Sequence, residues 1–198
     1  MAYSGHSQYV HWVCPEARGQ LDIADMHVPR SQKKEMRRKI KDGVYQITIN
    51  QDFAAVMRYC AEEGESRPET WINDQIIKAF IELHELGHAH CVEYRENGEL
   101  LGGLYGLKIG GAFMGESMFS RVPSASKIAL VHLAARLWKG GFEVLDTQFV
   151  NDHLLQFGAY EIHHKDYMRR LKRAINIEAD FMLDGADEMA LVQDFLAR

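Results

Sequence analysis

The sequence predicts an α+β fold in which helices flank a mixed sheet. Within residues 89–106, two alternating apolar stretches flank an Asn-Gly pair at 97–98, which is a strong signal for a β-hairpin. A third stretch of strand character at 111–119 extends this hairpin into an antiparallel meander. Residues 126–148 then read as a helix followed by a strand, and a helical crossover makes the strands that it joins parallel. Both kinds of pairing are therefore expected in one sheet.

The segments ahead of the hairpin alternate between helical and strand periods. An Asp-Gly pair at 42–43 is typical of a helix end, and Asp52 stands where a helix N-cap is expected. These signals predict a basic helix over 31–41, a strand over 44–49, and amphipathic helices over 52–63 and 73–87.

The hairpin and the segments after it complete the sheet. Glycines at 140–141 are expected to end the crossover helix. The periods predict strands over 89–95, 99–106, 111–119, 142–148 and 159–163, and helices over 126–141, 149–158 and 165–175.

Composition bounds the class of protein. At 198 residues, with 46% hydrophobic and 26% charged residues, the chain has the make-up of a water-soluble globular protein. It contains no run of about 18 apolar residues, the length that a membrane span needs, so we expect a cytoplasmic protein. The three cysteines lack CxxC spacing, which disfavours both a disulfide framework and a cysteine zinc site.

The net charge of −5 is unevenly distributed along the chain. Residues 176–198 hold six acidic residues against Arg198 alone, so the remainder is neutral. Within that remainder, 30–41 has seven basic residues and one acid, and 163–173 is a second basic run. Such faces fit a polyanion such as RNA, although on charge alone solvated helix surfaces are the commoner case.

The segment HELGHAH at 84–90 matches HExxH, the zinc-peptidase pattern in which two histidines on one helical face bind the metal. Such a helix has to continue past the second histidine. Here Gly87 stands where a C-cap glycine belongs, and strand periodicity starts within two residues of His88. The two imidazole rings would then lie on different elements, and a third ligand is undefined. The sequence therefore disfavours a zinc site, and we expect no metal.

Polar residues on two predicted strands are the strongest signs of a binding site. Asp146 and Gln148 stand at i and i+2 at a strand end, so their side chains converge on one side, and ligands gather at such ends. Glu116 lies between apolar neighbours, where a carboxylate needs a partner or a function. Glycines in or beside the strands favour close approach of a ligand or another backbone, and they stand at 102, 103, 106, 110, 111 and 115.

At these positions the sequence resembles the leucyl/phenylalanyl-tRNA–protein transferases. The matching stretches occur in the family's order over nearly the whole chain, and GESMFS followed by SASK, within 115–127, is the most specific of them. The others are HWVCPEARG (11–19), HVPRS (27–31), TWI (70–72), LHELGHAHCVEY (83–94), GGLYG (102–106), DTQFVNDH (146–153) and FGAYEI (157–162).

The resemblance implies an architecture and an activity. A GNAT-like catalytic domain is expected over 31–175, after a short, truncated N-terminal unit at 1–30 and before an acidic tail at 176–198, for which a helix is one option. Enzymes of this family transfer Leu or Phe, with Met as a further candidate, from aminoacyl-tRNA to the α-amine of proteins that begin with Arg or Lys. This transfer marks the acceptor for degradation by the N-degron route. The implied partners are Leu-tRNA, Phe-tRNA and those proteins. No cofactor, DNA or membrane is implied, and a monomer is expected.

The resemblance also implies roles for single residues. Asp146 would orient and polarise Gln148, which would contact the attacking amine or the tetrahedral oxygens. Glu116 and Asn151 would hold the acceptor. The remaining implied sites are an apolar aminoacyl pocket of Leu104, Phe113 and Met118, a place for the 3′-terminal adenosine between Trp12 and Trp71, and tRNA backbone contacts from Arg30, Lys33, Lys34, Arg37 and Arg38.

Three other functions stay open on sequence alone. A GNAT-type acetyltransferase that uses acetyl-CoA would need a glycine-rich pyrophosphate loop before the helix at 126–141, and residues 119–126 contain no glycine. A zinc peptidase would contain stoichiometric zinc. A non-catalytic binder would hold tRNA or peptide without turnover.

Overall fold

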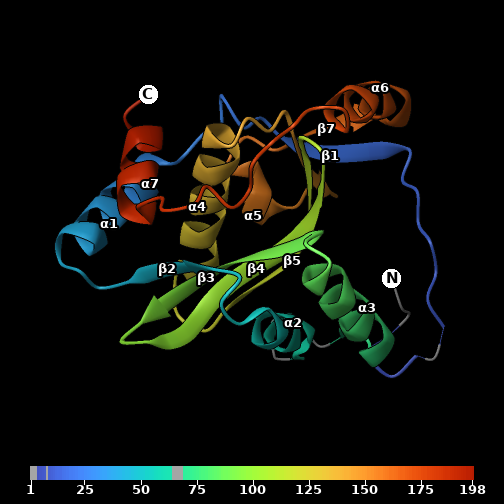
Figure 1. Ribbon diagram of the computed structural model, residues 1–198, viewed down its shortest axis with the longest axis horizontal. Coiled ribbons are helices and arrows are strands. Elements are labelled where there is room, and N and C mark those ends of the chain that lie inside the picture. The colour runs from blue at the N-terminus through green and yellow to red at the C-terminus, as the bar shows by residue number, and fades with distance from the viewer. Residues whose placement is uncertain (1–3, 8, 64–68) are drawn as a thin grey trace.

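The computed structural model describes residues 4–7, 9–63 and 69–198. These residues form a seven-stranded sheet with the strand order β2-β3-β4-β5-β6-β1-β7 (Figure 1). Its neighbouring strands pair antiparallel except β5 and β6, which are parallel. The predicted α+β fold with a mixed sheet is therefore confirmed. The strands are β1 Ala17–Leu21, β2 Gln46–Ile49, β3 Ala89–Glu96, β4 Glu99–Ile109, β5 Ala112–Ser120, β6 Val144–Gln148 and β7 Tyr160–His163.

Helices cover both faces of the sheet, because alternate strand residues enter different cores. Leu104 packs in the core that contains α4, its neighbour Tyr105 in the core of α2 and α3, and Met114 in a third core with α6. Among the described helices, none has the length and apolar character needed to cross a bilayer. The helices are α1 Arg30–Lys41, α2 Phe53–Ala61, α3 Asp74–Glu85, α4 Ala125–Lys139, α5 Asp152–Leu155, α6 His164–Ala174 and α7 Glu188–Leu196.

The turn and cap signals act as the sequence indicates. Asn97 and Gly98 have φ values of +51° and +82° in the two-residue turn between β3 and β4, the left-handed pair that a type I′ hairpin requires. The Asp52 carboxylate accepts a hydrogen bond from the N–H of Ala55 and caps α2. α4 has no side-chain cap of this kind, because the hydroxyl of Ser124 at its N-cap position donates to Glu35 at 2.9 Å.

The helix that carries the HExxH match ends where the sequence predicts. α3 stops at Glu85, and Gly87 takes a φ of +79°. The His84 ring stacks on Phe53 at 4.3 Å, with Nδ1 at 2.8 Å from the carbonyl oxygen of Ala89. His88 follows the helix end, so the two histidines lie on different elements. Within the described part of the chain, no three His, Cys, Asp or Glu residues are grouped to hold a metal ion.

Segments near both ends of the chain belong to the main sheet or pack against its helices, which the sequence does not indicate. The segment before residue 30 shows no clear period, yet Ala17–Leu21 forms β1, which lies between β6 and β7 in the main sheet. The acidic tail ends in α7, which packs against α4 with Val192 and Phe195 buried. Register with partners far along the chain, rather than local periodicity, defines β1.

The parallel strands stay together for only a short distance. Ala112–Met114 pairs with Val144–Asp146, after which β5 continues to Ser120 without β6 beside it. The helix predicted over 149–158 is shorter than expected, because the chain stays extended at Asn151 before α5 begins. Because the pairing of β5 with β6 ends at Met114 and Asp146, the two strands diverge beyond these residues.

Two of the strand glycines are explained by packing rather than by a ligand. A Cβ at Gly102 would lie 2.4 Å from the Cβ of Ala125 in α4, and one at Gly106 would lie 2.3 Å from the carbonyl oxygen of Met114. These glycines let α4 and β5 approach β4 closely.

Candidate active site

The divergence of β5 and β6 opens a cavity of about 610 Å³. Its inner wall is apolar, while Glu116 and Gln148 bring polar groups to its lining. Its lining includes four leucines that are each at most 3% exposed, namely Leu104, Leu130, Leu133 and Leu145. The cavity therefore offers a buried apolar end and a polar edge, the arrangement typical of a small-molecule site.

The predicted aminoacyl-pocket residues do not all meet here. Leu104 and Met118 line the cavity. Phe113 is fully buried outside it and stacks on Phe181 at a centroid distance of 5.4 Å. Phe113 supports the core beneath the C-terminal tail and does not line the pocket.

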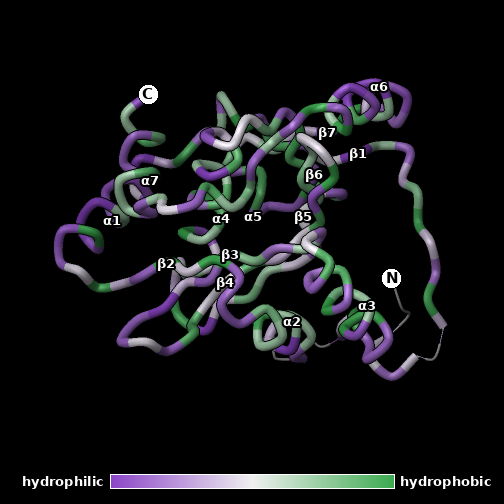
Figure 2. The backbone as a smooth tube through the Cα atoms, in the orientation of Figure 1, coloured by the Kyte–Doolittle hydropathy of each residue, from purple (hydrophilic) through white to green (hydrophobic). Residues whose placement is uncertain are grey.

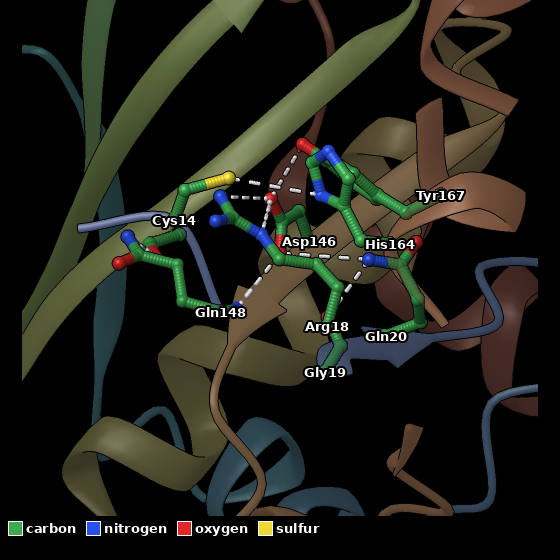
Figure 3. Close-up of polar contacts among 9 residues, drawn as sticks. Cys14, Arg18, Gly19, Gln20, Asp146, Gln148, His164 and Tyr167 are labelled. Atoms are coloured by element: carbon green, nitrogen blue, oxygen red, sulfur yellow. Dashed lines mark hydrogen bonds and ion pairs between the residues drawn. The ribbon is translucent and has the colours of Figure 1, made fainter. Parts of the chain in front are cut away.

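Asp146 is completely buried and fully hydrogen-bonded (Figure 3). Arg18 of β1 binds the carboxylate with two nitrogens, Nη2 at 2.7 Å and Nε at 2.9 Å from Oδ2. The Tyr167 hydroxyl donates to Oδ2 at 2.8 Å, and Gln20 Nε2 lies 3.5 Å from Oδ1. The backbone N–H of Gln148 donates to Oδ1 at 2.8 Å. Asp146 thus holds Gln148 through its backbone, which differs from the expected polarisation of the Gln148 side chain.

Gln148 lies in a tight turn at the end of β6. Its φ is +62°, a left-handed conformation that costs a residue other than glycine about 1–3 kcal/mol and that clusters at functional sites. Gly19 of β1 lies opposite Gln148, and a Cβ at Gly19 would lie 2.6 Å from Thr147 Oγ1. The Gln148 side chain donates to the Gly115 carbonyl at 3.2 Å. The turn therefore holds the amide at the edge of the cavity.

The charges around Asp146 are fixed by burial and pairing. Burial, and then the charge and hydrogen bond of Asp146, raise the pKa of Tyr167, so its phenol stays protonated and donates. Burial acts to lower the pKa of Arg18, but the hydrogen bond and charge of Asp146 outweigh it, and the pKa is raised. Arg18 is therefore a permanent cation beside the site.

Glu116 is the carboxyl group at the edge of the cavity. Burial raises the pKa of Glu116, and the nearby charge of Asp146 adds to that rise, while a hydrogen bond from Gln148 partly offsets it. A half-buried carboxyl group with a raised pKa in a cavity is typical of a functional site.

A second cavity of about 560 Å³ lies between the N-terminal segment 10–15 and α3. Trp12 and Trp71 both line it, although the Trp12 side chain is completely exposed. Both cavities are lined by Trp71, Glu116, Gln148 and Phe149. The two cavities therefore meet at the Gln148 turn.

The other predicted contacts are distributed differently. Asn151 lines the first cavity, and its side-chain oxygen accepts from the N–H of Leu154 at 3.0 Å, which caps α5. The predicted tRNA contacts, Arg30, Lys33, Lys34, Arg37 and Arg38, all lie on α1, and none of them lines either described cavity.

Sequence reasoning missed three residues that hold Asp146. Arg18 and Gln20 lie on β1, and Tyr167 lies on α6, within the second basic run. Arg18 is 128 positions from its partner, so no local period indicates the pair. The available signal was the occurrence of Arg18 inside one of the family-like stretches, 11–19.

Comparison with known proteins finds relatives over most of the chain. The family model for leucyl/phenylalanyl-tRNA protein transferase matches residues 21–172. A relative of that name from Paramagnetospirillum magneticum is 52% identical and aligns with 97% of this chain and 91% of its own length. One from Maricaulis maris is 47% identical over 91% of this chain and 82% of its own.

Solved structures resemble the chain only loosely. The structure of L-PGS from Bacillus licheniformis has 11% identity and a TM-score of 0.45, over 69% of this chain and 46% of that one. The family assignment therefore rests on the sequence matches, which span most of the chain. The chain belongs to the leucyl/phenylalanyl-tRNA protein transferase family and is an aminoacyltransferase.

Proposed function

We propose that the protein transfers Leu or Phe from aminoacyl-tRNA to the N-terminal α-amine of proteins that begin with Arg or Lys, and so marks them for degradation by the N-degron route. The observation that carries this proposal is the meeting of two cavities at Gln148 and Glu116. An aminoacyl-adenosine with its side chain in the first cavity and its base in the second has its ester carbonyl at this junction.

The two cavities suit the two ends of the donor. The leucine-lined end of the first cavity takes an apolar side chain, since burial of Leu or Phe stabilises the complex by about 1.5–3 kcal/mol. Trp12 and Trp71 both line the second cavity, so an adenine bound there would have an aromatic face to stack on, with a gain of about 1–3 kcal/mol. Leu-tRNA or Phe-tRNA is therefore bound through its terminal aminoacyl nucleotide.

The reaction needs no enzyme nucleophile, because the tRNA ester is already activated. The α-amine of the acceptor, with an ordinary pKa of about 8, attacks the ester carbonyl as the neutral amine. The new C–N bond forms, the ester C–O bond breaks, and the proton lost by the amine ends on the departing ribose oxygen. In the structure the Gln148 amide donates to the Gly115 carbonyl and to Glu116. When Glu116 pairs with the cation of the acceptor, the released N–H donates to the developing tetrahedral oxygen, and the fixed turn keeps the amide in place.

Asp146 is a positioning residue in this proposal. Its oxygens are taken by Arg18, Tyr167 and the Gln148 backbone, so it neither attacks the ester nor takes the proton of the amine. Its loss releases the turn and with it the amide donor.

Glu116 recognises the acceptor. Its ionised carboxylate attracts the cationic side chain of an N-terminal Arg or Lys at the junction of the cavities. Asn151, which also lines the first cavity, helps to hold the acceptor. Partial burial strengthens such an attraction relative to water.

A transfer assay tests the proposal. Leu-tRNA is incubated with the protein and a peptide that begins with Arg, and mass spectrometry follows the addition of one leucyl residue to the α-amine. We expect product with Arg and Lys peptides and none with the N-acetylated peptide. The absence of product from the folded protein refutes the transfer, and equal product from a peptide that begins with Asp refutes the role of Glu116.

A further inference from the structure

α6 carries a stripe of exposed basic side chains. Lys165, Arg169, Lys172 and Arg173 follow the spacing i, i+4, i+7 and i+8, which places them on one helical face. The opposite face buries Tyr167 and Ala174 against β6 and β5. Figure 2 shows α6 as a predominantly hydrophilic segment at the edge of the molecule. The stripe defined by these four residues is not part of either described cavity.

α6, the helix that carries this stripe, is hydrogen-bonded to the candidate active site. The Tyr167 hydroxyl bonds Asp146 at 2.8 Å, and the Arg18 guanidinium lies 4.9 Å above the Tyr167 ring. The first turn of α6 is joined to the N-terminal segment, because the N–H of His164 donates to the Glu16 carbonyl at 2.8 Å. The same N-terminal segment carries Trp12 to the second cavity.

The other basic helix lies elsewhere. α1 packs against α7, whereas α6 packs against β1, β6 and β7. In Figure 1, α6 and the N-terminal segment lie on the right side of the molecule, together with α3, and α1 lies at the left edge. A nucleic acid that leaves the second cavity therefore meets α6 before it can reach α1.

The charges already paired on the stripe do not block it. Arg173 is paired with Glu143 at 2.7 Å, and Arg169 with Asp166. Both arginines are more than 70% exposed, and exposed ion pairs are worth only about 0–1 kcal/mol. Among the described residues, no carboxylate lies within 4.0 Å of the ammonium groups of Lys165 or Lys172. Phosphates can therefore compete for this surface.

We propose that the α6 stripe binds backbone phosphates of the tRNA acceptor stem next to its 3′ end. The proposal rests on the function above, because it takes the terminal adenosine to lie in the second cavity. Contacts with phosphates carry no sequence information, so they hold tRNAs of different sequence in one orientation.

The test compares two triple variants with the same loss of charge. Lys165→Ser, Arg169→Ser and Lys172→Ser are combined on α6. The matched control combines Arg58→Ser, Lys139→Ser and Arg198→Ser, three exposed basic residues that lie on neither α1 nor α6 and line neither cavity. The dissociation constant of deacylated tRNA is measured at several salt concentrations. Because each lost phosphate contact lowers the salt slope by about 1, the α6 variant should bind tRNA at least about tenfold more weakly at low salt, with a slope smaller by about 2–3.

A minimal donor separates docking from catalysis. Leucyl-adenosine lacks the acceptor stem, so the α6 variant should transfer leucine from it at the wild-type rate. Wild-type tRNA affinity in the α6 variant overturns the proposal, as does an equal or larger loss in the control variant. A loss with leucyl-adenosine that matches the loss with tRNA also overturns it, because the stripe then serves the fold. Binding of deacylated tRNA does not depend on turnover, so failure of the transfer reaction itself is seen separately.

Discussion

Replacement of Asp146 by Asn is the sharpest test of how the site is held together. The change removes the negative charge from a carboxylate that is 0% exposed and leaves Arg18, whose side chain is 17% exposed, without its partner. It also turns an amide N–H toward a donor, because Arg18, Tyr167 and the Gln148 backbone all donate to Asp146. Loss of one partner from a buried pair costs about 3–5 kcal/mol.

The free energy of unfolding of the Asp146→Asn variant should therefore fall by about 3–5 kcal/mol in urea denaturation at neutral pH. Asp152→Asn is the matched control, since Asp152 is exposed and its replacement should change stability by no more than about 0.5 kcal/mol. Tyr167→Phe removes a single hydrogen bond to the carboxylate and should cost about 1.5–3 kcal/mol. An orphaned buried charge costs about 3–5 kcal/mol. If the free energy of unfolding of Asp146→Asn lies within about 1 kcal/mol of the wild-type value, the network is refuted.

Three further predictions follow from the site and the core. In Gly19→Ala the new Cβ lies 2.6 Å from Thr147 Oγ1, so the turn is displaced and the single-turnover rate falls with tRNA affinity unchanged; a wild-type rate would contradict this. Because burial raises the pKa of Glu116, its ionised form destabilises the fold above that pKa. Glu116→Gln should therefore raise the melting temperature at neutral pH, while KM for an Arg peptide rises. A lower melting temperature would contradict this. Burial lowers the pKa of His90 to about 4 and of His132 to about 3. Below about pH 6.5 the unfolded chain therefore binds more protons than the folded protein. The free energy of unfolding should then fall by about 1.4 kcal/mol per pH unit for each of these histidines, down to about pH 4. Urea titrations from pH 7 to 4 measure that slope, and His90→Phe should lower it by about 1.4 kcal/mol per pH unit.

Local signals predicted the parts of the fold that local physics controls. The Asn97-Gly98 turn and the helix end before Gly87 both depend on left-handed φ values, which Gly and Asn adopt most readily. Asp52 caps α2 through a contact three residues away. The strand character of β3 and β4 was also predicted, but both faces of these strands are buried, whereas alternation is typical of a strand with one solvated face.

The site depends on contacts that no window of sequence contains. Arg18 and Asp146 are 128 positions apart, and Tyr167 lies on a helix whose basic face dominates its sequence pattern. Phe113 shows the same limit in another form. Alternation gives the face of β5 on which it lies, but the stacking of its ring on Phe181, from a distant part of the chain, places it in the core and not in the cavity.

The rate of a single turnover by Gln148→Ala tests the central claim most directly. Leucine transfer from Leu-tRNA to an N-terminal Arg peptide is followed by rapid quench, with tRNA affinity measured in parallel. Because removal of one preorganised donor to a tetrahedral oxygen costs about 100- to 1,000-fold in rate, the variant should slow by that factor while its tRNA dissociation constant stays within about twofold of wild type. Transfer at the wild-type rate would contradict the account, because the junction of the two cavities would then not be where the ester reacts.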